Sequence, residues 1–257
     1  MEIKQYDYDH LAKFYDIMEL TGIDHEQLND FLIKLFRHYK VENVLDFTAG
    51  TGAQAITLAK LGFKVTANDL NKSMLDIAKL KAKEKNLNIE FHEGNIINAN
   101  YGEFDAVISM YNAIGHLSKE EFGKALRNIA NNLKDNGIYV FDICNLDYMK
   151  NGGFIDHEFM DLALEKDDVK YVRFNNNKID FDTGIFNINQ TSYVQVNNEE
   201  PKEYKESFDL QIYGIDELSE IITGSGFEIM FKYGGYGYKF DKNDSASILM
   251  VVRKKDR

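Results

Sequence analysis

Val44-Leu45-Asp46-Phe47-Thr48-Ala49-Gly50-Thr51-Gly52 is the stretch of the 257-residue chain that decides its fold. An apolar run comes first, two glycines follow, and residues 53–61 then form a helical pattern that stops at Gly62. Glycines between a strand and a helix let the backbone approach a ligand, and the helix N-terminus behind them favours an anionic group. The stretch therefore predicts a strand, a ligand-binding loop and a helix.

The same alternation of strand and helix continues on both sides of this stretch. Short apolar runs predict strands at 44–47, 64–68, 89–92, 104–109 and 138–143, with helices of about 10 to 15 residues between several of them. One of these helices opens with the capping box Ser118-Lys119-Glu120-Glu121. This order predicts an α/β protein with a doubly wound, Rossmann-like sheet.

Beyond the fifth strand the hydrophobic period changes to two. Residues 159–213 alternate apolar and polar positions, as in an antiparallel sheet with one buried face. A helix capped by Asp216 and two closing strands, 227–233 and 246–253, complete a core sheet of seven strands whose last strand is antiparallel. We therefore predict three parts: a cofactor-binding core with N-terminal helices at 1–151, an antiparallel β lid at 152–214, and completion of the core sheet at 215–257.

Composition excludes several classes of protein. The chain has 30 Lys and Arg against 42 Asp and Glu, and its net charge of −12 repels phosphate backbones, so no nucleic-acid partner is expected. A polar N-terminus and the lack of a long apolar run predict a cytoplasmic protein that does not enter a membrane. The single cysteine, Cys144, excludes an intramolecular disulfide, and the histidines lack ligand spacing, so no metal is expected.

Asp69 complements the glycine loop. It ends the second predicted strand 17 residues after Gly52, where a carboxylate can accept hydrogen bonds from two ribose hydroxyls. Gly50-x-Gly52-x-x-Ala55 also fits a dinucleotide fingerprint, so an NAD-dependent oxidoreductase is one reading of the pattern. A tight turn without any ligand is another.

Four ordered motifs between residues 44 and 117 resemble those of the class I S-adenosylmethionine-dependent methyltransferases. They are the stretch quoted first, with its acid before the glycines, then Asn68-Asp69-Leu70-x-x-x-Met74-Leu75-x-x-Ala78, Glu93-Gly94-Asn95-Ile96 and Phe104-Asp105-Ala106-Val107-Ile108. The resemblance implies a methyltransferase with S-adenosylmethionine as its cofactor and S-adenosylhomocysteine as its product. The insertion after the fifth strand and the closing antiparallel pair also suit this family.

The resemblance assigns a set of residues to the cofactor. Asp69 would hold both ribose hydroxyls, Asn95 and Ile96 would contact the adenine, and Met110 and Tyr111 would border the sulfonium. The full set is Asp46, Thr48, Ala49, Gly50, Gly52, Asp69, Leu70, Met74, Asn95, Ile96, Met110 and Tyr111.

Two of these positions depart from the usual family pattern. Thr48 stands where a glycine is common, so its backbone should need no positive φ. Asn95 replaces a frequent Asp and so exchanges a pure acceptor for a group that can both donate and accept.

The predicted acceptor is a small molecule. Residues 113–117 and 11–16 resemble small-molecule N-methyltransferases of the amino-sugar and glycine types, which also carry a β lid at this place. This implies in-line methyl transfer to an amine nitrogen, in a protein that could be a homodimer. A small-molecule O-methyltransferase and a non-catalytic S-adenosylmethionine-binding module are the alternatives, although Asp69 argues against the second.

Tyr15 and His116 are the predicted catalytic residues. Each could accept a hydrogen bond from the acceptor nitrogen and so orient its lone pair. Tyr15 could instead be an aromatic anchor, and His116 a helix cap. Arg173 could bind a substrate carboxylate, although a solvated strand residue is the simpler interpretation.

Overall fold

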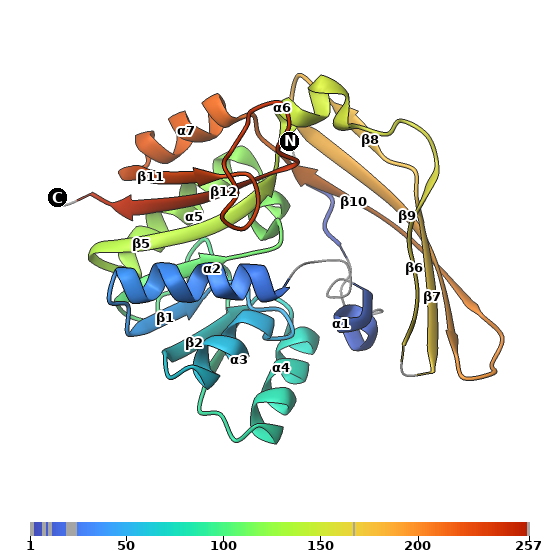
Figure 1. The fold of residues 1–257 in the computed structure, drawn as a ribbon, viewed down its shortest axis with the longest axis horizontal. Coiled ribbons are helices and arrows are strands. Elements are labelled where there is room, and N and C mark those ends of the chain that lie inside the picture. Colours follow the sequence, from blue (N-terminus) through green and yellow to red (C-terminus); the bar gives the residue numbers. More distant parts are fainter. Residues whose placement is uncertain (1–2, 7–8, 10–11, 19–24, 167, 256–257) are drawn as a thin grey trace.

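A seven-stranded sheet forms the centre of the protein. The computed structural model describes residues 3–6, 9, 12–18, 25–166 and 168–255. The strands of the central sheet are β1 (Asn43–Asp46), β2 (Lys64–Asp69), β3 (Glu90–Glu93), β4 (Phe104–Ser109), β5 (Leu133–Cys144), β11 (Phe227–Tyr233) and β12 (Ser247–Lys254). Their order is β11-β12-β5-β4-β1-β2-β3, and β12 runs antiparallel to both of its neighbours, β5 and β11, whereas all other pairs are parallel (Figure 1). The predicted Rossmann-like sheet with an antiparallel last strand is confirmed.

Helices of eight or more residues alternate with these strands. They are α2 (His25–His38), α3 (Ala53–Lys60), α4 (Lys72–Glu84), α5 (Lys119–Asn131) and α7 (Ile215–Gly224). Shorter elements are η1 (Ala12–Phe14), α1 (Tyr15–Met18), η2 (Ala113–His116), α6 (Leu146–Tyr148) and η3 (Met149–Gly153). Within the described ranges, no helix has both the length and the apolar character that crossing a membrane requires.

The ends of two helices test the capping signals. The capping box at the start of α5 is present, since the Ser118 and Glu121 side chains each bind the other residue's backbone N–H. The expectation that Asp216 caps α7 is wrong, because the N-cap is Gly214. The first N–H of α7, that of Ile215, donates instead to the Asp147 carboxylate of α6 at 2.8 Å, so a distant element supplies the cap.

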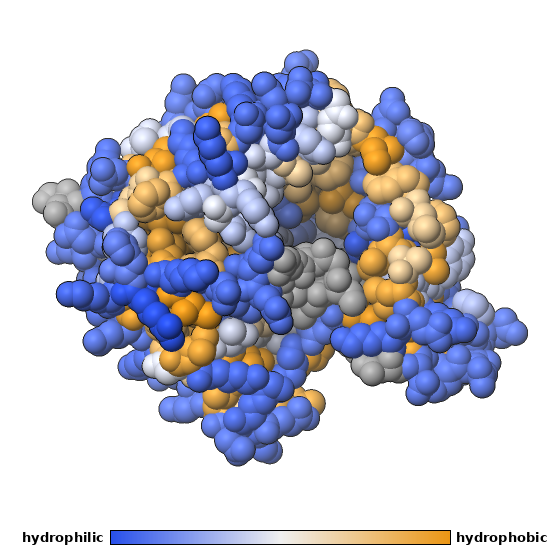
Figure 2. All heavy atoms as spheres, viewed as in Figure 1, coloured by the Kyte–Doolittle hydropathy of each residue, from blue (hydrophilic) through white to orange (hydrophobic). Residues whose placement is uncertain are grey.

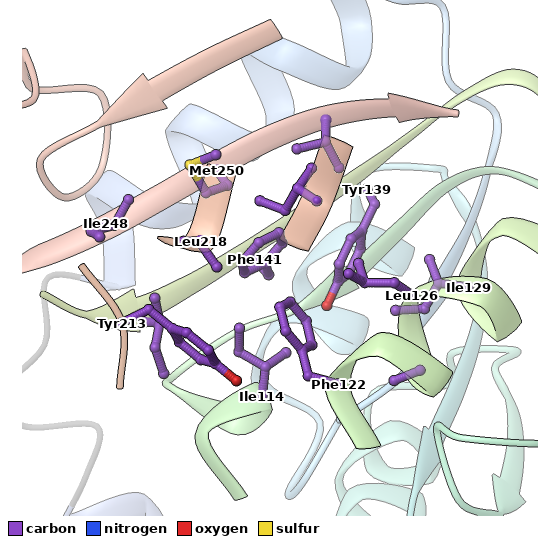
Figure 3. Packing of buried hydrophobic residues seen from close by; sticks show 14 of the residues in the cluster. Ile114, Phe122, Leu126, Ile129, Tyr139, Phe141, Tyr213, Leu218, Ile248 and Met250 are labelled. Carbon is purple, nitrogen blue, oxygen red and sulfur yellow. The ribbon is translucent and has the colours of Figure 1, made fainter. Parts of the chain in front are cut away.

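Successive strand residues point to opposite faces of the central sheet, and helices cover both faces. On one face, Tyr139 and Phe141 of β5 pack against α5, with the Phe122 and Phe141 ring centroids 5.8 Å apart (Figure 3). On the other face, Val140 packs in a cluster with Leu28 and other residues of α2 and α3. Because both faces are buried, ligands reach the sheet only at the ends of its strands.

A second sheet, residues 159–211, stands beside the core (Figure 1). Its strands are β6 (Phe159–Lys166), β7 (Val169–Asn175), β8 (Lys178–Asp180), β9 (Ile185–Val196) and β10 (Lys202–Gln211), all paired antiparallel as predicted. Phe186 and Ile188 of β9 and Phe208 and Leu210 of β10 belong to the same hydrophobic cluster as α5 and β5. The second sheet therefore shares its hydrophobic core with the central sheet.

Candidate active site

A cavity of about 580 Å³ lies at the carboxyl ends of β1, β2 and β4. The strand order reverses between β1 and β4, which is where open α/β sheets bind ligands. The cavity volume lies within the range of about 300–1,000 Å³ that is typical of sites for small molecules and cofactors. The predicted residues that line it are Tyr15, Thr48, Ala49, Gly50, Asp69, Leu70, Met74, Asn95, Ile96, Met110, Tyr111 and His116.

Two predicted cofactor residues, Asp46 and Gly52, do not line this cavity. The Asp46 side chain is only 2% exposed and accepts the backbone N–H groups of Thr48 and Ala55, which hold the loop and the first turn of α3. Burial, with the nearby Asp69 charge as a second cause, raises the pKa of Asp46 to about 7. Gly52 has a φ of +83°, and a Cβ there would lie 3.0 Å from the Cβ of Ala78 on α4. Both residues shape the glycine loop, residues 47–52, from behind.

Asp69, at the end of β2, faces the cavity and binds backbone N–H groups. Its Oδ2 accepts the N–H of Gly50 at 2.7 Å, and its Oδ1 accepts the N–H of Asn71 at 2.8 Å. Burial raises the pKa of this carboxyl above its usual range. The N–H of Leu70 is a further backbone donor to this carboxylate. The two oxygens have about four lone pairs between them, so the carboxylate retains capacity for a ligand hydroxyl such as that of a ribose.

Thr48 and Asn95, the two positions that depart from the family pattern, both fit the local backbone. Thr48 has no positive φ, as predicted. The Oδ1 of Asn95 accepts the N–H of Ile97 at 2.9 Å, so the NH₂ group of Asn95 is the part that it can offer to a ligand. Asn68, which is buried, donates to the carbonyl groups of Phe47 and Gly94 at 2.9 Å each and so ties the loop after β1 to the loop after β3.

The turn after β4 has an unusual backbone. Tyr111 and Asn112 have φ values of +63° and +57°, in the left-handed region that non-glycine residues adopt uncommonly. The buried carboxylate of Asp142 on β5 accepts both of their N–H groups, and burial raises the pKa of Asp142 to about 6. The Tyr111 hydroxyl accepts from Gln54 of α3 at 2.6 Å. The turn is thus held from β5 and from α3.

Tyr15 and His116 come to the same cavity from opposite ends of the core. The neighbour of Tyr15 on α1, Asp16, accepts from the Thr51 hydroxyl and pairs with Lys81 of α4, which docks α1 onto the glycine loop. His116 ends η2, and its ring stacks on Phe208 of β10 with the centroids 6.0 Å apart. Burial lowers the pKa of His116 to about 4, so its imidazole is neutral at physiological pH.

The second sheet contacts this site from outside. A recess separates the core from the second sheet in Figure 2, but among the described residues none between 159 and 211 lines the cavity. Instead, Phe208 packs edge-on against Tyr6 at 4.7 Å, and the N–H of Asp209 donates to the Lys4 carbonyl at 2.9 Å. The expectation that this sheet covers the site is therefore corrected: it supports residues 3–6 and η2, which form that wall.

Arg173 of β7 does not line the cavity either. Its guanidinium pairs with Asp161 of β6 at 2.6 Å, and the two side chains are 12% and 29% exposed. The pair is thus a contact between neighbouring strands of the second sheet, and its geometry gives no support to a substrate carboxylate at Arg173.

Several known proteins resemble this chain in sequence or in fold. Residues 44–137 match the family described as a methyltransferase domain. A putative methyltransferase of Geobacillus sp. is 25% identical over 254 residues, which are 96% of this chain and 99% of that protein. A glycine/sarcosine N-methyltransferase of Parasynechococcus marenigrum is 36% identical over 132 residues, which are 50% of this chain and 47% of that protein.

Residues 44–137 belong to the methyltransferase-domain family, in a chain that has the fold of the class I S-adenosylmethionine-dependent methyltransferases. This assignment combines the domain match with the strand order and with the pairing of a glycine loop and Asp69. S-adenosylmethionine is its cofactor. A solved structure of an S-adenosylmethionine-bound amino pentose methyltransferase from Micromonospora echinaspora has a TM-score of 0.77 at 17% identity, over 95% of this chain and 97% of that one, and shares the fold.

Several residues that line the cavity of the methyltransferase carry no sequence signal for it. They are Ile3, Gln5, Tyr6, Gln54 and Glu121. Gln5 reaches the site because its amide donates to the carbonyl of His116, 111 residues away, at 2.9 Å. Glu121 was recognisable only as a capping residue. In the described part of the chain, no group of three or more His, Cys, Asp or Glu is placed to hold a metal ion.

Proposed function

We propose that this methyltransferase methylates the amine nitrogen of a small molecule by in-line displacement. The observation that carries the proposal is the neutral His116 beside the cavity, whose pKa burial lowers to about 4. A hydroxyl acceptor benefits from a general base whose pKa lies near the working pH, and this histidine is too weak a base for that purpose. An amine with some free base present needs no such help.

The related proteins support an amine acceptor. One of them is named a glycine/sarcosine N-methyltransferase and another an amino pentose methyltransferase. The cavity is also of small-molecule size, and the net charge of −12 argues against a nucleic-acid acceptor.

The residues of the cavity divide into a cofactor side and an acceptor side. We assign Asp69 to the ribose, the NH₂ of Asn95 and Ile96 to the adenine, and the loop at Thr48–Gly50 to the methionine portion. Met110 and Tyr111 would border the reacting sulfur, where bound S-adenosylmethionine supplies an electrophilic methyl group on a sulfonium. The remaining wall, with Tyr15 and His116, then faces the acceptor.

Tyr15 and His116 would orient the nitrogen rather than deprotonate it. The N–C bond forms as the C–S bond breaks, and the proton that the nitrogen then carries in excess leaves to solvent. Holding the lone pair in line with the breaking bond supplies much of the rate in such a transfer.

A panel of acceptors tests the proposal. Purified protein is incubated with S-adenosylmethionine and with amines, amino acids, phenols, alcohols or RNA, and release of S-adenosylhomocysteine is measured, with mass spectrometry of each product. We expect turnover with small amines alone. Turnover confined to hydroxyl acceptors or to RNA would contradict the proposal.

A further inference from the structure

Charge is unevenly distributed around the cavity. Two acidic side chains, those of Asp69 and Glu121, line it, whereas no Lys or Arg side chain does so among the residues that the structure describes. The sequence that leads into α2 has the same bias, since residues 6–33 contain seven acidic residues and one basic residue, Lys13. A site of this sign attracts cations and repels anions.

Glu121 is the acidic group on the acceptor side. It follows η2 in the chain and lies one turn into α5, in the same wall of the cavity as His116 and Ser118. Its Oε2 accepts both the N–H and the hydroxyl of Ser118, at 2.9 and 2.7 Å. These two bonds leave the other carboxylate oxygen, Oε1, for a ligand. Because we assign Asp69 to the ribose of the cofactor, Glu121 is the acidic lining residue that is left to contact the acceptor.

We infer that Glu121 selects the acceptor, and that the acceptor is an amine without a carboxylate or phosphate group. The inference rests on the proposed N-methylation. As the N–C bond forms and the C–S bond breaks, positive charge moves from sulfur to nitrogen, and a carboxylate on the acceptor side stabilises that charge. An acceptor with a negative charge would be repelled by Glu121, and none of the described lining residues is a Lys or Arg that could pair with that charge.

The inference separates this chain from a relative that it resembles. The name of the Parasynechococcus marenigrum protein includes glycine, which carries a carboxylate beside its amine. In the present cavity, that carboxylate would meet Glu121 without a Lys or Arg partner among the described lining residues. Glycine should therefore be a poor acceptor here.

Matched pairs of acceptors test the charge rule. Ethanolamine and glycine differ in a hydroxymethyl group against a carboxylate, and glucosamine and glucosamine 6-phosphate differ in one phosphate. We expect kcat/KM for the member without the anion to exceed that for its partner by about 100-fold, as a lost charge-assisted contact would give. Equal values within each pair, or a preference for the anionic member, would overturn the inference.

Variants of two neighbouring glutamates separate charge from helix capping. Glu121→Gln removes the charge but keeps an oxygen that can cap α5. Glu120→Gln is the matched control, because Glu120 lies in the same helical turn, does not line the cavity and pairs with Lys124 at 2.7 Å. We expect Glu121→Gln to raise KM for the preferred amine about 10- to 100-fold with the Kd for the cofactor unchanged, and Glu120→Gln to change neither.

The outcomes distinguish this inference from the proposed function. If no amine is methylated, N-methylation itself fails. If amines are methylated but Glu121→Gln behaves like Glu120→Gln, only the role of Glu121 fails. Lys13→Ala completes the set: if the protein methylates glycine and this substitution abolishes that turnover, an anion site exists and the inference is overturned.

Discussion

Asp69 accepts the backbone N–H of Gly50 at 2.7 Å, so the acid after β2 holds the glycine loop after β1. The partner of this bond is a residue that the sequence motif places 19 positions earlier. The loop therefore has a defined conformation without help from a ligand, and little ordering entropy is lost when the cofactor binds. The same carboxylate must serve both the loop and the ribose.

The first prediction concerns this double use of Asp69. Asp69→Ala removes the acceptors of the ribose hydroxyls, so we expect cofactor binding to weaken by about 2–4 kcal/mol, roughly 30- to 1,000-fold in Kd. Titration calorimetry with S-adenosylhomocysteine measures it. Asp76→Asn, on the exposed face of α4, is the control and should leave Kd unchanged. A loss of less than about tenfold in Asp69→Ala would contradict the ribose assignment.

The second prediction concerns the pH dependence of stability. The pKa of Asp46 is about 7 in the folded protein against 3.8 for an ordinary Asp, so the folded state binds more protons between these pH values. Wild-type protein should therefore lose stability as pH rises from about 4 to 7, relative to Asp46→Asn, by about 1–4 kcal/mol in total. Denaturation by urea at several pH values measures this difference.

Asp105 provides a control of opposite sign. Burial acts to raise its pKa, but the ion pair with Lys134 and the N–H groups of Asn43 and Glu42 outweigh burial and lower it. Stability conferred by Asp105 is present above the unfolded pKa and is lost as pH falls through the folded pKa. Asp105→Asn should thus approach wild type at low pH. Parallel curves for wild type and Asp46→Asn would show that Asp46 does not titrate as described.

Local motifs predicted the cavity wall formed by the loops after β1 and β2 much better than the wall formed by residues 3–6. Asp69 and the glycine loop could be found because both lie at ends of regular elements whose period is visible in the sequence. The sequence could not show whether Asp46 binds the cofactor or the backbone of the loop, since an acidic residue before the glycines is compatible with both roles. Gln5 and Tyr6 join the site through contacts with His116 and Phe208, more than 100 residues away, and no local pattern encodes such contacts.

The third prediction concerns the second sheet. Phe208 is 8% exposed and packs against both Tyr6 and His116, so Phe208→Ala should cost about 3–5 kcal/mol of stability and should lower kcat more than cofactor affinity. Phe231→Ala is the control, because Phe231 is 40% exposed on β11. Denaturation, kcat and cofactor Kd are measured for both. If kcat of Phe208→Ala stayed at the wild-type value, the sheet would not position η2. Deletion of the whole second sheet is a less specific test, because the sheet shares its hydrophobic core with α5 and β5 and its removal should expose that core.

The fourth prediction concerns Tyr15 and His116. If both orient the acceptor nitrogen, Tyr15→Phe and His116→Asn should each lower turnover about 10- to 1,000-fold with the preferred amine at saturating cofactor. His92→Asn is a suitable control, because His92 lies outside the cavity and stacks on Tyr101. Both variants within about twofold of wild type would reduce Tyr15 to an anchor and His116 to a helix cap.

The pH profile separates orientation by His116 from proton transfer. A histidine with an ordinary pKa of about 6.5 would make the rate fall as pH drops through that value. The pKa of His116 is about 4, because burial disfavours the charged ring, so the histidine stays neutral above that pH. The fall in kcat/KM at low pH should therefore follow the pKa of the amine acceptor and shift when that acceptor is changed. An inflection near pH 6.5 that disappears in His116→Asn would show instead that the ring titrates as a base during the transfer.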